Sequence, residues 1–553
     1  MSRSILFALL LFTLAFPFAH GEAENRSSYD RWVDDLWTIE DVYWQNRIWP
    51  SSNPGPKPDL TEVLDREVID ARARRVLNIL DEVKERWNLS VDAHRLQLEL
   101  DRLAANTRAP NRLEQLFAAL DHDPLRLARA LALPTYANRL AAQLRLTGTT
   151  PPSNTDVATG HAVLEDWMPI ELPPIVGRQG FGPEAGTDTV TCTDDTWDTF
   201  MEEPTPRGLH TAVWTGSEMI IWGGSRNNEI YNSGGIYDPA TDSWTAMSTQ
   251  GAPAGKESHT AVWTGTEMIV WGGTDAVQFE TNTGGRYNPT TDTWTPTSTT
   301  GAPEPRVGHV SVWTGTEMII WGGDVGLSVL GPGGRYDPSS DTWTPMSDSP
   351  GPEQRPYAVA VWTGSEMLIN GGGSEDASDP FELYDDLWRY SPSSNSWTSA
   401  APMPGARRTQ HAGVWTDSEL LVWGGLGLEY DPEGDEYLSI ELDDGWRFNP
   451  ASGSWTAMGT AGSLPSARYL HTAVWTGNEM IVYGGFNGFD GGAYNPSADF
   501  WSFVPENGQG NELVDHTAVW TDSEMIIWGG TSSTFYGGIG EEQSKGSRFD
   551  PVS

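Results

Sequence analysis

Six basic residues recur along the C-terminal two thirds of the chain, each three residues before a histidine or its equivalent. They are Arg207, Lys256, Arg306, Arg355, Arg408 and Arg468. The residues that follow them are His210, His259, His309, Ala358, His411 and His471. Guanidinium groups hold carboxylates through paired, charge-assisted hydrogen bonds. If the six cations converge, they predict a site for an anionic ligand.

A structural role is the alternative for these cations, because a residue repeated in nearly every copy commonly supports the repeat itself. They could pair with backbone carbonyls or with an equally recurrent row of glutamates. That row consists of Glu218, Glu267, Glu317, Glu366, Glu419, Glu479 and Glu524. The histidines, spaced one per repeat, are interpreted as hydrogen-bonded packing residues rather than as a metal centre.

Segments that differ between repeats are the other candidates for binding. The longest are Glu375–Asp386, Leu426–Gly445 and Thr531–Gly546. The ligand-binding residues proposed in these variable segments are Tyr384, Asp385, Tyr430, Tyr437, Phe489 and Tyr536. Their aromatic rings and neighbouring carboxylates suit a peptide, a glycan or Ca²⁺, although no spacing matches an EF-hand loop.

The elements that must position these residues follow from a repeat that begins with a segment like HTAVWTGSEMIIWGG, at His210 to Gly224. Seven glycine pairs mark the copies, and they begin at Gly223, Gly272, Gly322, Gly371, Gly424, Gly484 and Gly529. Each copy reads as two hairpins: two β-branched strands around a tight turn, then an aromatic strand, an Asp-Pro or Asn-Pro turn and a tryptophan strand. Four strands per copy make one antiparallel blade.

Paired glycines after an apolar strand, then an aromatic residue and a tryptophan, resemble the Kelch-repeat family. The resemblance implies an all-β, seven-bladed β-propeller of four-stranded antiparallel blades, with the histidine-bearing strands innermost. The last copy stops at Ser553 without its tryptophan strand, whereas Asp195-Thr196-Trp197 reads like one. We therefore expect an N-terminal strand to close the ring.

The segment before the propeller has a different composition. Residues 1–21 read as a signal peptide, with a short basic start and an apolar run. Residues 22–146 show helical spacing of leucine and alanine, which predicts a small all-α domain; residues 147–192 form a Thr/Pro/Gly-rich linker, and 193–553 the propeller. We expect a secreted protein, periplasmic or extracellular, whose mature chain starts near Glu22.

Charge and cysteine content exclude several classes of function. Between Phe181 and Ser553 the chain has 51 acidic and 14 basic residues, which disfavours nucleic-acid partners. No stretch after the signal peptide is apolar enough for membrane insertion. The only cysteine, Cys192, precedes the first repeat. A galactose-oxidase-like copper site, which needs a cysteine inside the propeller, is therefore disfavoured, and we expect no cofactor.

These observations favour binding over catalysis. The expected function is that of a secreted interaction protein whose loop-bearing propeller face binds a protein, a peptide or a carbohydrate. The alternative is a carbohydrate-active enzyme of the sugar-acid epimerase or lyase type, with its site in the central funnel. The two differ in whether a bound sugar is turned over.

Overall fold

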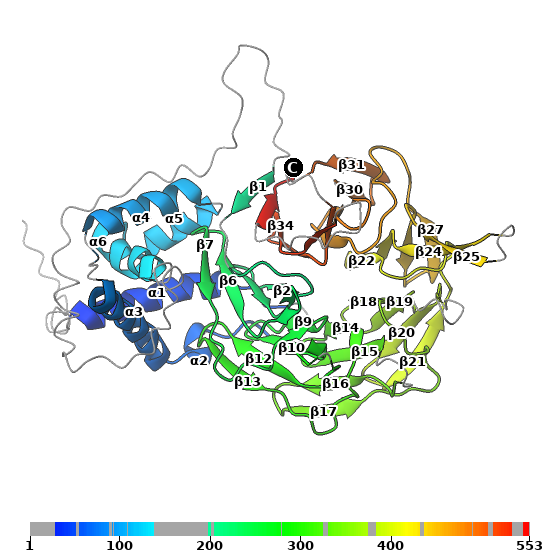
Figure 1. Cartoon of the computed structure of the whole chain (residues 1–553), viewed down its shortest axis with the longest axis horizontal. Coiled ribbons are helices and arrows are strands. Elements are labelled where there is room, and N and C mark those ends of the chain that lie inside the picture. The colour runs from blue at the N-terminus through cyan, green and yellow to red at the C-terminus, as the bar shows by residue number, and fades with distance from the viewer. Residues whose placement is uncertain are drawn as a thin grey trace, which may run out of the picture.

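The structure is a computed structural model that places an all-α region beside a ring of antiparallel sheets (Figure 1). It describes residues 28–50, 53, 55–87, 91, 93–107, 109–137, 197–200, 204–277, 279–324, 330–373, 383–431, 436–488, 490–506, 512–533 and 546–551. The expected signal peptide and linker lie outside these ranges.

The all-α region consists of short helices around a shared apolar core. They are α1 (Ser28–Asn46), α2 (Leu60–Val63), α3 (Arg66–Trp87), α4 (Ala93–Asn106), α5 (Pro110–Ala119), α6 (Pro124–Leu127) and the π-helical turn η2 (Ala128–Ala132). Leu100, Leu103, Leu113 and Leu116 are fully buried in this core. Leu64 adopts an extended conformation and separates α2 from α3. None of the helices in the described ranges is long and apolar enough to cross a membrane.

The strands form seven four-stranded sheets, here called blades one to seven. Blade one contains β2 (Thr211–Trp214), β3 (Met219–Trp222), β6 (Gly234–Asp238) and β7 (Ser243–Ala246). Blade two contains β9 (Thr260–Trp263), β10 (Met268–Trp271), β12 (Gly284–Asn288) and β13 (Thr293–Pro296). Blade three contains β14 (Val307–Trp313), β15 (Met318–Asp324), β16 (Gly334–Asp337) and β17 (Thr342–Pro345). Blade four contains β18 (Val359–Trp362), β19 (Met367–Asn370), β20 (Leu387–Ser391) and β21 (Ser396–Ala400).

The remaining three blades have the same order. Blade five contains β22 (Ala412–Trp415), β23 (Leu420–Trp423), β26 (Gly445–Asn449) and β27 (Ser454–Ala457). Blade six contains β28 (Thr472–Trp475), β29 (Met480–Tyr483), β30 (Gly491–Asn495) and β31 (Phe500–Val504). Blade seven contains β33 (Thr517–Trp520), β34 (Met525–Trp528), β36 (Gly546–Phe549) and β1 (Trp197–Phe200).

The ring is closed as the sequence predicts. The first strand of every blade contacts the first strands of both neighbouring blades, so these strands line the central axis. In blade seven, β1 pairs antiparallel with β36, with Trp197 opposite Phe549. The seven-bladed propeller, its innermost strands and its closure by an N-terminal strand are therefore confirmed.

Each blade is packed against the next through its second strand, which is buried along its whole length. The tryptophan that ends this strand packs on the fourth-strand tryptophan of the next blade, as Trp222 does on Trp294 with ring centroids 5.3 Å apart. Trp528 and Trp244 make the same contact between blades seven and one, at 5.6 Å. These aromatic pairs bury large apolar areas at the junctions between blades.

The glycine pair has a steric cause. Gly223 and Gly224 have φ values of 72° and 85°, and a β-carbon on Gly223 would lie 2.5 Å from the ring of His259 in the next blade. The second glycine of every pair donates its N–H to a main-chain carbonyl of the next blade, as Gly224 does to Lys256 at 2.7 Å. Only glycine permits this close approach.

Candidate functional site

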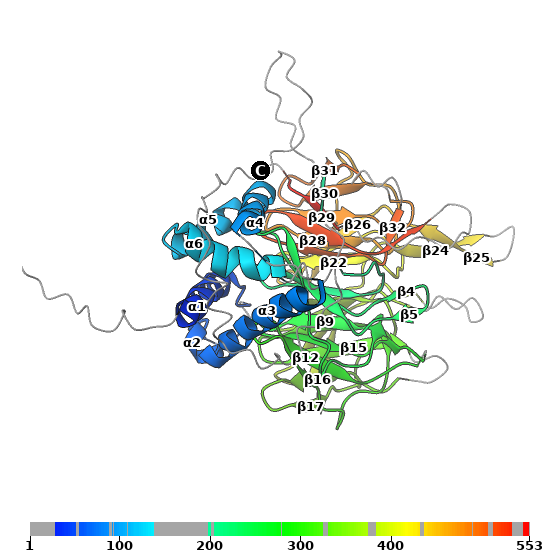
Figure 2. The same cartoon turned by 60° about the vertical axis from the view of Figure 1, so that its left-hand side comes forward.

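The propeller has two different faces. The turn face carries the first-to-second and third-to-fourth strand turns, such as Thr215–Glu218. The loop face carries the second-to-third strand loops and the segments that lead into the first strands. Small extra sheets rise from the loop face, among them the hairpins β4 (Ser225–Arg226) with β5 (Glu229–Ile230) and β24 (Leu426–Asp431) with β25 (Glu436–Glu441), while the helices lie on the other side (Figure 2). Two further short sheets pair β8 (Lys256–Glu257) with β11 (Thr274–Asp275) and β32 (Glu512–Val514) with β35 (Thr531–Ser533).

The six recurrent cations are buried at the loop-face end of their blades, with at most 3% of each residue exposed. Arg207 shows the arrangement: its guanidinium donates to the Gly223 carbonyl at 2.9 Å and to the Ser233 carbonyl at 2.8 Å. Arg306, Arg408 and Arg468 bond in the same way to the first glycine of their own pair. Each of these arginines thus holds together the two ends of its second-to-third strand loop.

Burial lowers the pKa of these groups: Arg207 and Arg306 to about 10, and Lys256 to about 8. In blades four to six a carboxylate accompanies the cation. Arg355 lies beside Asp386 at 2.5 Å, Arg408 beside Asp444 at 2.8 Å and Arg468 beside Asp490 at 2.6 Å. In blades one to three the cations instead donate to backbone carbonyls and hydroxyl groups, as Lys256 does to the Thr283 hydroxyl at 2.8 Å.

The recurrent glutamates do not pair with these cations, which corrects one of the two structural partners expected for them. Strand two runs from the glutamate on the turn face to the glycine pair on the loop face, and this separates the two groups by the length of a four-residue strand. Five of the glutamates instead meet an arginine on the third strand, as Glu366 meets Arg389 at 2.6 Å and Glu419 meets Arg447 at 2.7 Å.

The structure brings two of the expected site residues together. The guanidinium of Arg355 lies 3.8 Å from the ring centroid of Tyr384, whose hydroxyl donates to Glu353 at 2.7 Å. Asp385 is half-buried next to them. Tyr430 and Tyr437 lie opposite each other in the β24–β25 hairpin of blade five. Phe489 and Tyr536 lie outside the described residues.

The histidines link neighbouring blades, as expected for packing residues. His259 shares a hydrogen bond with the Thr211 hydroxyl of blade one at 2.8 Å, and His210 shares one with Thr517 of blade seven, also at 2.8 Å. Where the threonine is Val310, the next blade has Ala358 in place of the histidine. His411 and His471 instead face Val359 and Ala412, so the expected hydrogen bond is missing among the described residues at these two junctions. Within the described residues, no three His, Cys, Asp or Glu side chains gather closely enough to hold a metal ion. Binding of Ca²⁺ stays a prediction.

The mouth of the propeller on the loop face is formed by seven residues that sequence reasoning missed. Each comes directly before the histidine position and has φ between 52° and 63°: Leu209, Ser258, Gly308, Tyr357, Gln410, Leu470 and Asp515, here called the mouth ring. Neighbouring members are joined through their backbones, as where Ser258 donates to Leu209 at 3.1 Å and Tyr357 to Gly308 at 2.9 Å. One backbone conformation therefore presents seven different residues around the axis.

Apolar side chains are exposed at this mouth and in the loops around it. Leu209 and Tyr357 of the mouth ring are 36% and 42% exposed. Val277 and Phe279, in the loop of blade two, are 67% exposed, and Leu438 of the β24–β25 hairpin is 46% exposed. These side chains share the loop face, and exposed apolar side chains of this kind are typical of a surface that binds another molecule.

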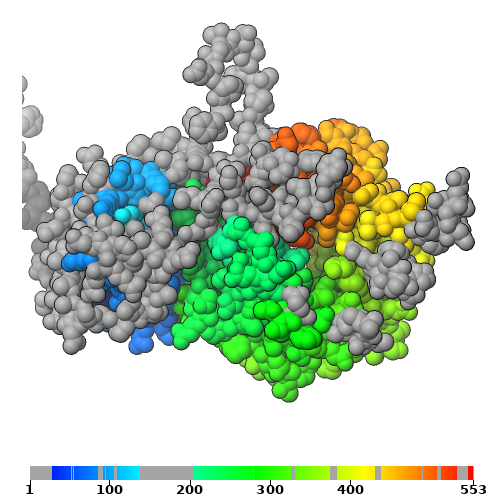
Figure 3. All heavy atoms as spheres, in the orientation of Figure 1, coloured from blue at the N-terminus to red at the C-terminus, as the bar shows by residue number. Residues whose placement is uncertain are grey.

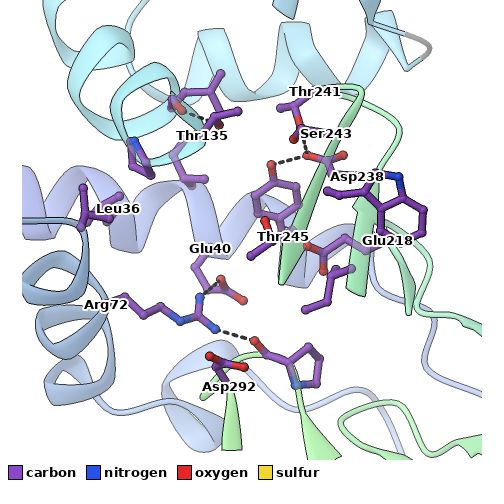
Figure 4. Close-up of a pocket in the computed structure, with 18 of the residues that line it drawn as sticks. Leu36, Glu40, Arg72, Thr135, Glu218, Asp238, Thr241, Ser243, Thr245 and Asp292 are labelled. Atoms are coloured by element: carbon purple, nitrogen blue, oxygen red, sulfur yellow. Dashed lines mark hydrogen bonds and ion pairs between the residues drawn. The ribbon is translucent and has the colours of Figure 1, made fainter. Parts of the chain in front are cut away.

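The helical region occupies the turn face of blades one and two. Arg47, at the end of α1, is buried between Glu40 at 3.1 Å and Glu218 of blade one at 3.5 Å. Arg72 of α3 donates to Glu40 and to the Pro289 carbonyl of blade two, at 2.9 and 2.6 Å (Figure 4). In the space-filling view, the blue and cyan helical region lies beside the green first blade (Figure 3).

More contacts extend this interface. Tyr43 donates to Asp238 at 2.8 Å, Arg75 meets Asp292 at 2.6 Å and Arg112 donates to the Ser217 carbonyl at 2.8 Å. Asn53, between α1 and α2, donates to the Thr264 carbonyl at 2.7 Å. A cavity of about 230 Å³ remains between the helices and blades one and two. Burial in this interface raises the pKa of Glu218 to about 7, and Arg47 opposes that rise.

Comparison with known proteins agrees with this architecture. The family model described as KLHDC2/KLHL20/DRC7 Kelch-repeats domain matches residues 187–323 and 258–485. The chain belongs to the Kelch-repeat family. Among curated proteins, this Kelch chain is 36% identical to Kelch domain-containing protein 10 of Rattus norvegicus over 92 residues, which is 15% of this chain and 22% of the relative.

The human Kelch domain-containing protein 10 gives the same identity over 87 residues, 15% of this chain and 19% of that protein. The flagellar outer-arm dynein alpha chain of Chlamydomonas reinhardtii is also 36% identical, over 96 residues, which cover 17% of this chain and 2% of the dynein chain. The chain thus spans about a fifth of the length of its Kelch domain-containing relatives.

Proposed function

We propose that this protein is a binding module whose loop face holds a segment of another protein. Kelch propellers generally bind other proteins. The mouth ring supports the finer proposal, that the loop face holds a segment of the partner. Its seven positions share a backbone fixed by hydrogen bonds between blades, yet they differ in side chain. Such a frame allows specificity to vary without disturbing the packed sheets.

The surroundings of the mouth ring support a peptide-sized partner. Exposed Leu209, Tyr357, Val277, Phe279 and Leu438 offer apolar and aromatic contacts around one opening. Aromatic and aliphatic anchors of this kind supply most of the free energy in protein interfaces. The net charge of the propeller segment favours a partner with basic groups beside its apolar anchors.

The test is a selection of peptides from a random display library on the immobilised full chain. We expect selected peptides to lose at least tenfold in affinity for a Leu209→Ser, Tyr357→Ser variant. Ser523→Ala, a change in a turn on the opposite face, is the control and leaves affinity unchanged. Peptides that bind the mouth-ring variant as tightly as the unchanged chain contradict the proposal. Turnover of a sugar-acid panel by the purified chain supports the enzyme alternative instead.

We also propose that the protein is secreted. The basic start and apolar run of residues 1–21 support secretion to the periplasm or the medium. Sequencing the N-terminus of the purified, natively expressed protein tests it, with Glu22 or a near neighbour as the expected first residue. A mature protein that retains Met1 contradicts export.

A further inference from the structure

A third-strand arginine bridges neighbouring blades in most of the propeller. It pairs with the glutamate of its own blade and, in several blades, donates to a proline carbonyl of the next one. Arg335 meets Glu317 at 3.4 Å and the Pro392 carbonyl at 2.8 Å. Arg447 meets Glu419 at 2.7 Å and the Pro496 carbonyl at 2.6 Å. The arginines at this position are Arg286, Arg335, Arg389, Arg447 and Arg548.

Blade one lacks this arginine, because its third-strand residue is Ile236. The two contacts that this arginine makes in other blades are nevertheless present in blade one. Arg47 reaches Glu218, and Arg72 reaches Pro289, the carbonyl equivalent to Pro392 and Pro496. Two arginines of the helical region therefore replace the missing one, and this blade is the place where the helices dock. In blade one, the missing third-strand arginine thus coincides with the docking of a basic helical segment.

Blade six is the other exception, with Ala493 at this position. Within the described residues, the Glu479 carboxylate accepts a side-chain hydrogen bond from the Asn495 amide at 3.5 Å. Glu479 is half-buried at the turn face. It is thus the counterpart of Glu218 without the arginine that Glu218 receives from α1.

The outer strand beside Glu479 carries a second peculiarity. Phe500 and Phe503 of β31 are 46% and 52% exposed. The positions equivalent to Phe500 hold only small hydroxyl residues in the first five blades: Ser243, Thr293, Thr342, Ser396 and Ser454. Those equivalent to Phe503 hold Ala246, Pro296, Pro345, Ser399 and Ala457. Phe500 lies opposite Asn495 in the sheet, and the Asn495 amide reaches Glu479, so Phe500 and the carboxylate are neighbours. Phe503 lies opposite Gly492, on the other face of the same strand.

From this arrangement we infer that Glu479 and Phe500 form a second docking surface, separate from the loop face, for a basic amphipathic helix of a partner protein. The helix places an arginine on Glu479 and an apolar side chain on Phe500. Charge favours a partner over a second copy of this chain, because two propellers of net charge −37 repel each other. Blade one shows the same kind of contact made within the chain.

The test uses the full chain and a fluorescent 18-residue helical peptide with a leucine stripe and flanking arginines, beside a matched peptide with glutamines for the arginines. Fluorescence anisotropy should show binding of the arginine peptide, at least tenfold tighter than the glutamine peptide. Glu479→Gln and Phe500→Ser should each weaken binding of the arginine peptide at least tenfold. Glu229→Gln removes one exposed charge from the loop face and should leave binding unchanged.

A variant that adds a contact distinguishes a loss of peptide binding from a loss of folding. Ala493→Arg supplies the in-blade arginine found in five other blades, and it should abolish peptide binding while the melting temperature is kept. Equal binding to all variants, or no binding by the unchanged chain, overturns the proposal. It is also overturned if the chain is a dimer that Phe500→Ser converts to a monomer, or if the peptide binds only after deletion of residues 147–192. A second copy or the chain's own segment is then the occupant.

Discussion

The guanidinium of Arg47 lies 3.5 Å from the carboxylate of Glu218, and this contact joins the end of α1 to the first blade. Arg47 is 5% exposed, and Glu40, on the same helix, faces it from the other side. Two carboxylates thus share one buried cation at the boundary between the helices and the propeller. Removing that cation takes the arginine away from Glu218, whereas Glu40 keeps its ion pair with Arg72.

Arg47→Ala should lower the free energy of unfolding by about 3–5 kcal/mol, the usual cost of breaking a buried ion pair. Urea unfolding followed by tryptophan fluorescence measures the change. Arg66→Ala is the matched control, because Arg66 pairs with Asp34 at the surface and is 52% exposed; its expected cost is about 0–1 kcal/mol. Similar losses in both variants would mean that the Arg47 contact does not stabilise the interface.

Acid should destabilise the propeller through its histidines. Burial lowers the pKa of His259, His309 and His471 to about 3 and that of His516 to about 4, whereas the unfolded chain titrates near 6.5. The unfolded chain therefore binds more protons between these values, and stability is lost as pH falls below about 6.5. Urea midpoints between pH 4.5 and 7.5 should rise with pH.

Glu218 acts in the opposite direction. Its pKa of about 7 is above its ordinary value of 4.5, so its contribution to stability declines as pH rises through that interval. Several histidines outweigh one glutamate, and Glu218→Gln should make the rise of the urea midpoint with pH steeper. A flatter profile in this variant would contradict the assignment.

Arg306→Ala combined with Arg408→Ala distinguishes the two roles of the recurrent cations. Both side chains are fully buried and hold the ends of their loops, so we expect the variant to melt earlier, with a loss of about 2–5 kcal/mol for each arginine. Arg407→Ala, at the exposed neighbour of Arg408, should leave the melting temperature unchanged. Normal melting together with lost binding of a sugar acid would favour the anionic-ligand site.

Deletion of Thr193–Phe200 should lower the melting temperature sharply, because it removes β1 and opens blade seven along β36. Adding the peptide TDDTWDTF should restore part of the loss by strand addition. Differential scanning fluorimetry measures both effects. An unchanged melting temperature in the deletion variant would show that the ring does not depend on this strand.

The blades could be predicted from the sequence because each position of the repeat occurs in seven copies, and the residue types found there can be compared. Gly216, Gly265 and Gly315 have φ values near 100°, and Asp417 and Asp522 hold positive values at the same turn, as the restricted residue types indicate. The hydrogen bond from Tyr237 to Asp242, in the turn between the third and fourth strands, also corresponds to residue types that recur together in the repeats. Where the tyrosine becomes Phe448, the aspartate becomes Gly453.

The helical docking could not be predicted, because it has one copy and joins residues such as Arg47 and Glu218 that are far apart in the chain. Ile236 in place of the third-strand arginine was the one local signal for it. The mouth ring was missed for another reason. Its residues share a backbone conformation and no side-chain type, so a search for recurring residues passes over Leu209 and Tyr357.

The pairing of β1 with β36 also sets an order for folding. β1 leaves the ribosome before any repeat, whereas its partner follows all of the other blades, so the two can meet only late in synthesis. Contacts of such long sequence separation form slowly. The ring therefore stays open during synthesis. If the chain is exported, β1 and β36 can pair after it has crossed the membrane.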